Sequence, residues 1–92
     1  MYLEIVSPEA TLFAGNVTSV TVPGINGEFQ ILQNHAPIVS LLQEGEVKVQ
    51  GDITIDKAFE NKFSKGINGE TVLSITSGTF EMKENKVIVL AD

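Results

Sequence analysis

Turn-forming residue pairs divide this chain at intervals of about ten residues, and this spacing constrains the fold more than any other feature. Glycine tolerates a positive φ angle, and asparagine and aspartate hydrogen-bond to their own backbone, so such pairs favour tight turns. The pairs are Gly15-Asn16, Asn26-Gly27, Glu44-Gly45, Gly51-Asp52, Asn68-Gly69, Ser77-Gly78 and Glu84-Asn85. Short runs between regularly spaced turns are typical of β-sandwiches and barrels, so we predict an all-β fold.

The runs between these turns have the composition of β-strands. Alternating apolar and polar residues predict half-buried strands at 17–22, 45–49 and 79–83, after a β-prone opening run at 2–6. Residues 38–42 and 87–90 are continuous apolar runs, which we expect to form strands that are covered on both faces or lie in the core of a sandwich. With 92 residues and no linker or low-complexity run, the chain is predicted to form a single domain, residues 1–92.

The pentapeptide Gly-Ile-Asn-Gly-Glu occurs twice, at residues 24–28 and 66–70. Asn-Gly favours the type I′ turn of a two-residue hairpin, because both central residues of that turn need a positive φ angle. The flanking sequences of the two copies differ, so we interpret them as two similar turns and not as a duplicated half-domain.

The segment from residue 51 to residue 69 is the least regular part of the chain. A strand at residues 52–56 would put Asp52, Thr54 and Asp56 on one solvated face, and the further ligands of a calcium loop are missing. Phe59 and Phe63 are four positions apart, so a short helical turn would place both on one face. We predict a long hairpin excursion here.

The charged residues and the absence of cysteine exclude several functions. Without cysteine the chain has neither disulfides nor thiolate metal ligands, which suits a reducing compartment. The net charge is −6 and the basic residues begin only at Lys48, so nucleic-acid binding and a basic membrane anchor are not expected. No signal peptide and no apolar run of membrane-spanning length is visible, so we expect a cytoplasmic protein without membrane insertion.

His35 is the only histidine, and Glu28 lies seven positions before it. Acid–base catalysis would need the two groups within hydrogen-bond reach, usually beside a nucleophile, and the sequence has no G-x-S-x-G motif. One histidine also cannot form the usual zinc site. We therefore predict a structural or interface role for His35, no cofactor and no metal. An exposed His35 without any role is the second alternative, and a small enzyme that uses His35 is the least favoured one.

Three sequence blocks together resemble one protein family. They are Val22-Pro23-Gly24 with Gly27-Glu28-Phe29 and Ile31-Leu32; Asn34-His35-Ala36-Pro37; and Ser77-Gly78 and Phe80-Glu81 followed by Asn85-Lys86-Val87-Ile88-Val89-Leu90-Ala91-Asp92. In these blocks the chain is similar to the N-terminal domain of the epsilon subunit of F-type ATP synthase. The resemblance implies a β-sandwich of about ten short, mainly antiparallel strands, in agreement with the turn spacing.

The resemblance also implies a function. The family's domain is a noncatalytic subunit of the central stalk that binds the gamma subunit and the polar loops of the c-ring, and couples proton translocation to ATP synthesis. On this basis His35, Ser40 and Ser7 are expected at the gamma interface, and Gly27 and Glu28 at the c-ring interface. The expected location is the cytoplasmic face of a bacterial plasma membrane, as a peripheral part of the F1 complex.

Two further points limit the resemblance. Many family members continue into a C-terminal helical hairpin, which this sequence lacks, so inhibition and ATP sensing by that hairpin are not expected. The segment 51–69 also looks longer than is typical. The alternative function is a free-standing β-sandwich module that binds a ligand such as a carbohydrate; it would need exposed aromatic side chains along a groove, and the chain has no tryptophan and one tyrosine, Tyr2.

Overall fold

The computed structural model describes residues 1–92 and contains ten β-strands and one short 3₁₀ helix, which confirms the all-β prediction. The elements are β1 (Tyr2–Val6), β2 (Thr11–Asn16), β3 (Ser19–Gly24), β4 (Gly27–Leu32), β5 (Ile38–Leu42), β6 (Gly45–Gln50), η1 (Glu60–Lys62), β7 (Phe63–Lys65), β8 (Thr71–Ile75), β9 (Gly78–Lys83) and β10 (Lys86–Ala91). Because η1 has only three residues, the structure has no helix of membrane-spanning length.

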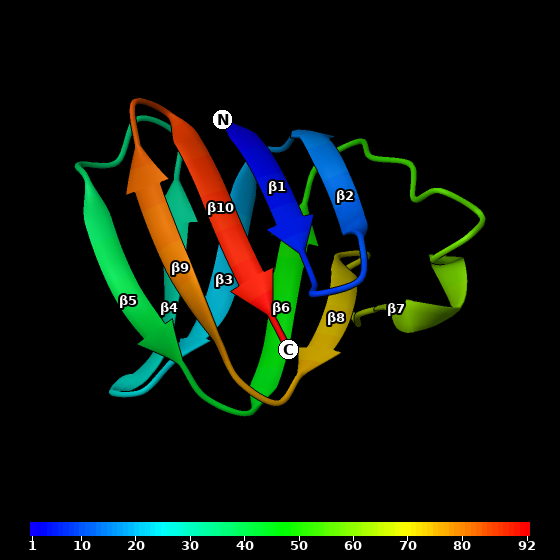
Figure 1. The fold of residues 1–92 in the computed structure, drawn as a ribbon. Helices are drawn as coiled ribbons and strands as arrows, with labels where there is room; N and C mark the ends of the chain where they lie inside the picture. The colour runs from blue at the N-terminus through cyan, green and yellow to red at the C-terminus, as the bar shows by residue number, and fades with distance from the viewer.

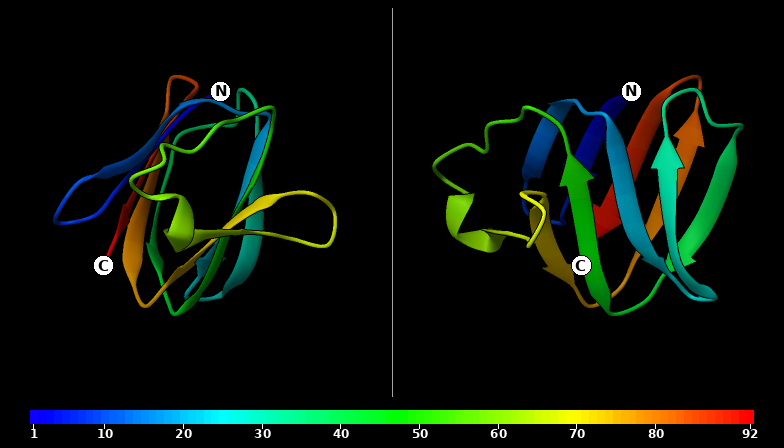
Figure 2. Two further views of the ribbon diagram at one scale, coloured as in Figure 1. Left: turned by 90° about the vertical axis from the view of Figure 1, so that its right-hand side faces the viewer. Right: turned by 180° about the vertical axis from the view of Figure 1, so that it is seen from behind.

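The strands form one curled sheet that folds into two layers (Figures 1 and 2). The front layer has the order β2-β1-β10-β9-β5, and the back layer contains β4, β3, β6, β8 and β7. The layers are joined where Leu42 of β5 pairs with Gly24 of β3. All pairings are antiparallel except that of β1 with β10, so the predicted mainly antiparallel sandwich is confirmed.

The core lies between the two layers and consists almost entirely of aliphatic side chains. Phe80 of β9 is fully buried and packs edge-to-face against Phe29 of β4, with the ring centroids 5.6 Å apart. This contact joins the middle of the front layer to the edge of the back layer. Burying a phenylalanine and packing it against a second ring contributes several kcal/mol, so this pair anchors the sandwich.

The prediction of type I′ turns at the two Asn-Gly pairs is wrong. Gly27 and Gly69 have positive φ angles of 122° and 79°, but Asn26 and Asn68 do not. At the second copy, the N–H of Gly69 donates to the carbonyl of Gly66, as in a type I turn that is followed by a glycine bulge. The type I′ geometry occurs instead at Glu84 and Asn85, with φ angles of 52° and 61°, between the paired Lys83 and Lys86.

Of the two interpretations of the apolar runs at residues 38–42 and 87–90, a position in the sandwich core is confirmed and cover on both faces is wrong. In β5, Val39 is 74% exposed and Leu41 is 58% exposed, and in β10 Leu90 is 49% exposed. Their neighbours Leu42, Val87 and Val89 fill the core. The front layer is thus buried on one side only, and no part of the chain covers its outer side.

The excursion after β6 differs from the predicted strand at residues 52–56. The side chains of this segment alternate between exposed and half-buried, but the segment belongs to no sheet. The 3₁₀ turn between Phe59 and Phe63 lets both rings pack against the core, as a helical turn was expected to do. The strands β2, β7 and β8 lack clear alternation and were not predicted; in β2 both Leu12 and Phe13 are buried, beside a register shift in β1.

Candidate partner-binding surfaces

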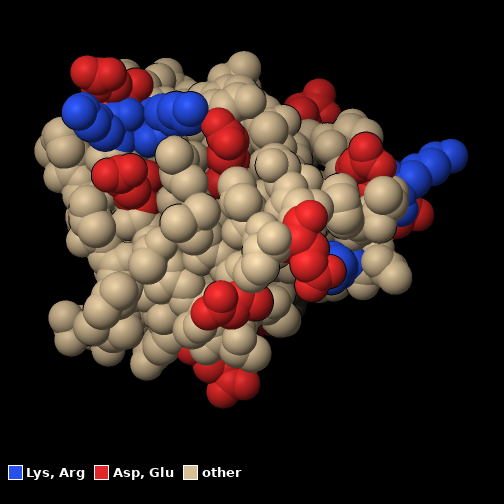
Figure 3. Space-filling model, viewed as in Figure 1, with Lys and Arg blue, Asp and Glu red and all other residues tan.

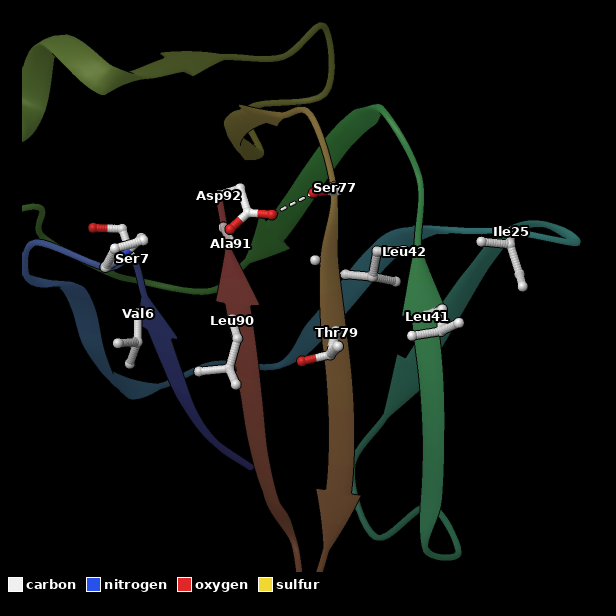
Figure 4. A pocket seen from close by; sticks show the side chains of 12 residues that line it. Val6, Ser7, Ile25, Leu41, Leu42, Ser77, Thr79, Leu90, Ala91 and Asp92 are labelled. Atoms are coloured by element: carbon white, nitrogen blue, oxygen red, sulfur yellow. Dashed lines mark hydrogen bonds between the residues drawn. The ribbon is translucent and has the colours of Figure 1, made fainter.

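The outer side of the front layer carries an apolar row across four strands. The strand register places Val6, Leu90, Thr79 and Leu41 side by side on β1, β10, β9 and β5. The close view in Figure 4 shows these four side chains in one line across the strands. With Ile25, which is exposed in the β3–β4 turn, they border a depression of about 610 Å³. We call this surface the front face.

The charge of the front face changes along the strands. The row next to the apolar one contains Glu4, Ile88, Glu81 and Val39, so two carboxylates follow directly. The row beyond it contains Tyr2, Lys86 and Lys83, and Lys86 forms an ion pair with Glu4 at 3.1 Å. In Figure 3, uncharged atoms cover the lower left of this side of the molecule and carboxylates lie around them. An apolar surface with charged neighbours is typical of a protein interface.

Ser7 and Ser40, two of the residues predicted for the gamma interface, lie at different places relative to the front face. Ser7 lies in the β1–β2 turn at the border of the depression, where its hydroxyl donates to the carbonyl of Ala10 (3.2 Å). Ser40 is half-buried and pairs with Phe80, so it is on the inward side of β5. The exposed residues of this strand are Val39 and Leu41, which the sequence analysis missed. The sequence feature that indicated them is the apolar run at residues 38–42, which forms a strand whose outer side no other part of the chain covers.

His35, the third residue predicted for the gamma interface, lies in the loop between β4 and β5, at the other end of the front face from Ser7. Its Nδ1 atom is 2.7 Å from the carbonyl oxygen of Ala36, and its side chain is exposed. The loop is held from the neighbouring β9–β10 turn, because the side-chain oxygen of Asn85 accepts a hydrogen bond from the N–H of Asn34 (2.9 Å). This hydrogen bond joins the His35 loop to the β9–β10 turn.

Glu28, predicted for the c-ring interface, is the second residue of β4 and follows Gly27, which comes directly after the exposed β3–β4 turn. Its carboxylate accepts a hydrogen bond from the ammonium group of Lys48 on β6 at 3.1 Å. This hydrogen bond, and then the charge of Glu28, raises the pKa of Lys48 above its usual value. The pair holds the Glu28 carboxylate over the outer side of the back layer.

The structure does not bring Glu28 and His35 together. They lie at opposite ends of β4, which corresponds to roughly 15 to 20 Å along the chain. Nowhere do three or more histidine, aspartate or glutamate side chains gather as a metal site would require. Tyr2 is the only exposed aromatic residue, and Lys86 lies 5.8 Å from its ring, so the aromatic groove of a carbohydrate-binding module is not present.

Comparisons with known proteins agree on one family. A family model described as ATP synthase, Delta/Epsilon chain, beta-sandwich domain matches residues 1–92. The ATP synthase epsilon chain of Chlorobaculum tepidum is 34% identical over 90 residues, which are 98% of this chain and 86% of that one. The epsilon chain of Campylobacter concisus is 37% identical over 92 residues, the whole of this chain but 60% of the relative's length.

Solved structures share the fold. A chain in the central stalk and c-ring structure of the Tetrahymena thermophila mitochondrial ATP synthase superposes with a TM-score of 0.72 at 13% identity, over 99% of this chain and 62% of that one. A chain of the Euglena gracilis mitochondrial ATP synthase gives a TM-score of 0.72 at 17% identity, over 97% of this chain and 48% of that one.

Proposed function

This chain belongs to the family of ATP synthase delta and epsilon chains, whose beta-sandwich domain it forms, and from this membership we propose that it is a noncatalytic subunit of the central stalk of an F-type ATP synthase. In this proposal it binds the gamma subunit and the c-ring and couples proton translocation to ATP synthesis. It works as a peripheral part of the F1 complex at the cytoplasmic face of a bacterial plasma membrane.

The uncovered front face carries the proposal. Val39 and Leu41 on β5 and Leu90 on β10 are exposed on either side of β9, in a layer whose other side is the core. Burying such a surface against a partner is favourable by about 25 cal/mol for each Å² of apolar area. We propose the gamma subunit as this partner, with His35 and Ser7 at the two ends of the contact. The side chain of Ser40 is on the inward side of β5, so in this proposal it does not contact gamma itself; it lies between Val39 and Leu41, which do.

The second contact proposed is that of the β3–β4 turn with the polar loops of the c-ring. Gly27 is exposed directly after the turn residues Ile25 and Asn26, and nothing lies within 4 Å of the place where its side chain would start. Glu28 offers a carboxylate that Lys48 already orients. A preorganised acceptor loses less entropy when it binds arginine or backbone N–H donors. Because Gly27 has a φ angle of 122°, Gly27→Val would also strain the fold, so Glu28 is the better residue to test.

The front face can be tested with a matched pair of substitutions. Leu41 on the front layer is 58% exposed, and Leu32 on the back layer is 56% exposed. We expect Leu41→Asp to weaken binding to the cognate gamma subunit at least roughly hundredfold, because a desolvated carboxylate would face the apolar contact. Leu32→Asp should bind as the unchanged chain does. Native mass spectrometry and calorimetric titration with purified gamma measure both.

The unfolding midpoint in urea serves as the control for these variants. Both leucines are exposed, so both variants should lose less than about 1 kcal/mol of stability. If Leu41→Asp and Leu32→Asp bind gamma with equal affinity, the front face is not the gamma-binding surface. Failure of the unchanged chain to bind gamma at micromolar concentration would contradict the stalk function itself. For the ring contact, Glu28→Gln should weaken assembly of the stalk on the c-ring and leave gamma binding unchanged.

A further inference from the structure

Two turns at one end of the sandwich are joined to each other by backbone hydrogen bonds. The N–H of Gln43 in the β5–β6 turn donates to the carbonyl of Pro23 at 2.9 Å, and the N–H of Ile25 in the β3–β4 turn donates to the carbonyl of Leu41 at 3.2 Å. Gly45 lies so close to Pro23 that a Cβ atom there would be 2.7 Å from the proline ring. The two turns therefore form one fixed surface.

This surface lies at the bottom of the molecule in Figure 1, and the β8–β9 turn lies beside it. Leu42 pairs with both Gly24 and Gly78, and these pairings bring the three turns together. We call the surface formed by residues 25–28, 43–46 and 76–77 the lower end. Ile25 is 52% exposed there, so the lower end presents an apolar side chain that a partner can cover.

Negative charge is in excess at the lower end. Its charged residues are Glu28, Glu44 and Glu46. Of the six lysines of the chain only Lys48 lies beside them, and its ammonium group is already paired with Glu28 at 3.1 Å; the other five are in residues 57–65 and 83–86. In Figure 3 carboxylates but no lysines are visible at the lower end. The three glutamates do not gather as a metal site would require, so the surface suits a protein partner.

Glu44 is the carboxylate that a partner of the lower end meets without a cation beside it. Its side chain is exposed, and it belongs to neither of the two ion pairs of the structure. A partner that covers the lower end removes water from this carboxylate, which is strongly unfavourable unless the partner supplies a positive charge. The partner must therefore carry a basic group at this place.

We propose that the polar loops of the c-ring contact the β5–β6 turn as well as the β3–β4 turn, and that a lysine or arginine of these loops pairs with Glu44. This inference rests on the proposed c-ring contact of Gly27 and Glu28 and extends it. Because the two turns are joined, a partner seated on Glu28 and Ile25 also approaches the β5–β6 turn. Complementary charge at this second turn fixes the orientation of the chain on the ring.

The test measures the dissociation constant between the purified cognate c-ring and the complex of this chain with gamma, by surface plasmon resonance. We expect Glu44→Gln to weaken binding roughly two- to fivefold, as the loss of a surface ion pair does. Glu44→Lys should weaken it at least roughly twentyfold, because two positive charges would then face each other. In about 1 M salt, where the Debye length is about 3 Å, the effect of Glu44→Lys should become smaller.

Glu60→Lys is the matched control. Glu60 is exposed on η1, away from the lower end, and belongs to neither ion pair, so this variant changes the net charge equally and should bind the ring as the unchanged chain does. The two lysine variants and Glu44→Gln should unfold at the same urea concentration as the unchanged chain, because they alter exposed side chains only.

The outcomes separate this inference from the proposed function. If Glu44→Lys and Glu60→Lys bind the ring equally while Glu28→Gln binds more weakly, the c-ring contact is supported and the β5–β6 turn is not part of it. If Glu44→Lys binds more tightly than the unchanged chain, the ring loops are acidic at this place and the inference is wrong. If the unchanged chain does not bind the ring, or if Glu28→Gln and Glu44→Lys both bind as it does, the c-ring contact itself is wrong and the inference with it.

Discussion

At the scale of single residues, Asn85 connects two turns that are far apart in the sequence. It adopts a φ angle of 61° in the β9–β10 turn, its backbone carbonyl accepts from the N–H of Tyr2, and its side chain accepts from the N–H of Asn34. The side-chain bond is the one that reaches the His35 loop. Asparagine serves both purposes because it tolerates the left-handed region and carries an acceptor.

Asn85→Gly separates these two purposes, because glycine keeps the backbone angle and removes the acceptor. We expect the amide of Asn34 to exchange faster with solvent and the affinity for gamma to fall roughly three- to tenfold, the equivalent of one hydrogen bond. Glu84→Gly is the matched control, since Glu84 has a similar φ angle of 52° and no hydrogen bond to this loop. If both variants lose the same affinity for gamma, the loss comes from the changed turn and not from the missing side-chain acceptor of Asn85.

At the scale of elements, the front face depends on how closely β9 approaches β10. A Cβ atom on Gly78 would collide with the backbone carbonyl oxygen of Leu90, which cannot move without opening the ladder between the two strands. We expect Gly78→Ala to lower the free energy of unfolding by about 1 to 3 kcal/mol. In Gly15→Ala the new atom meets only the end of the Phe13 ring, 3.1 Å away, so a smaller loss is expected. Urea denaturation of both variants checks this.

The elements also show why part of the structure could be predicted and part could not. Alternation at β6 and β9 identified these strands because one side of each faces the core. The run Ile38–Leu42 has no alternation, so it could not indicate which of its sides lacked cover. The segment at 52–56 alternates because every second side chain packs against the core, and this alternation predicted a strand. Whether a neighbouring strand is present to pair with it depends on the tertiary fold, which the pattern does not contain.

The predicted site residues are a similar case. The resemblance supplied Ser7, His35 and Ser40 as positions, and Glu28 and Gly27 at another turn. The structure adds which side chains are exposed around them, above all Val39 and Leu41 on either side of Ser40. Spatial neighbours such as Asn85 and Lys48 could not be found from the sequence, because they are brought to Asn34 and Glu28 by strands distant in the chain.

At the scale of the whole molecule, the sandwich connects its two proposed contact regions through the core. The Phe29–Phe80 contact joins β4, which begins at the Gly27 turn, to β9 in the middle of the front face. Protein interiors are close-packed and resist deformation, so a displacement of one region moves the other. A small, stiff body of this kind suits a subunit that transmits torque between two partners.

Net charge should keep the isolated molecule monomeric despite its exposed apolar row. At neutral pH the charge of −6 makes the copies repel one another, and this repulsion vanishes near the isoelectric point of about 4.6. We expect the chain to be monomeric at pH 7.5 and to associate reversibly near pH 4.6, as measured by multi-angle light scattering. Leu41→Asp should associate less than Leu32→Asp at the lower pH, because only Leu41 belongs to the front face. Equal association of the two variants would mean that the copies associate through another surface, and that loss of the net charge does not make the front face self-associate.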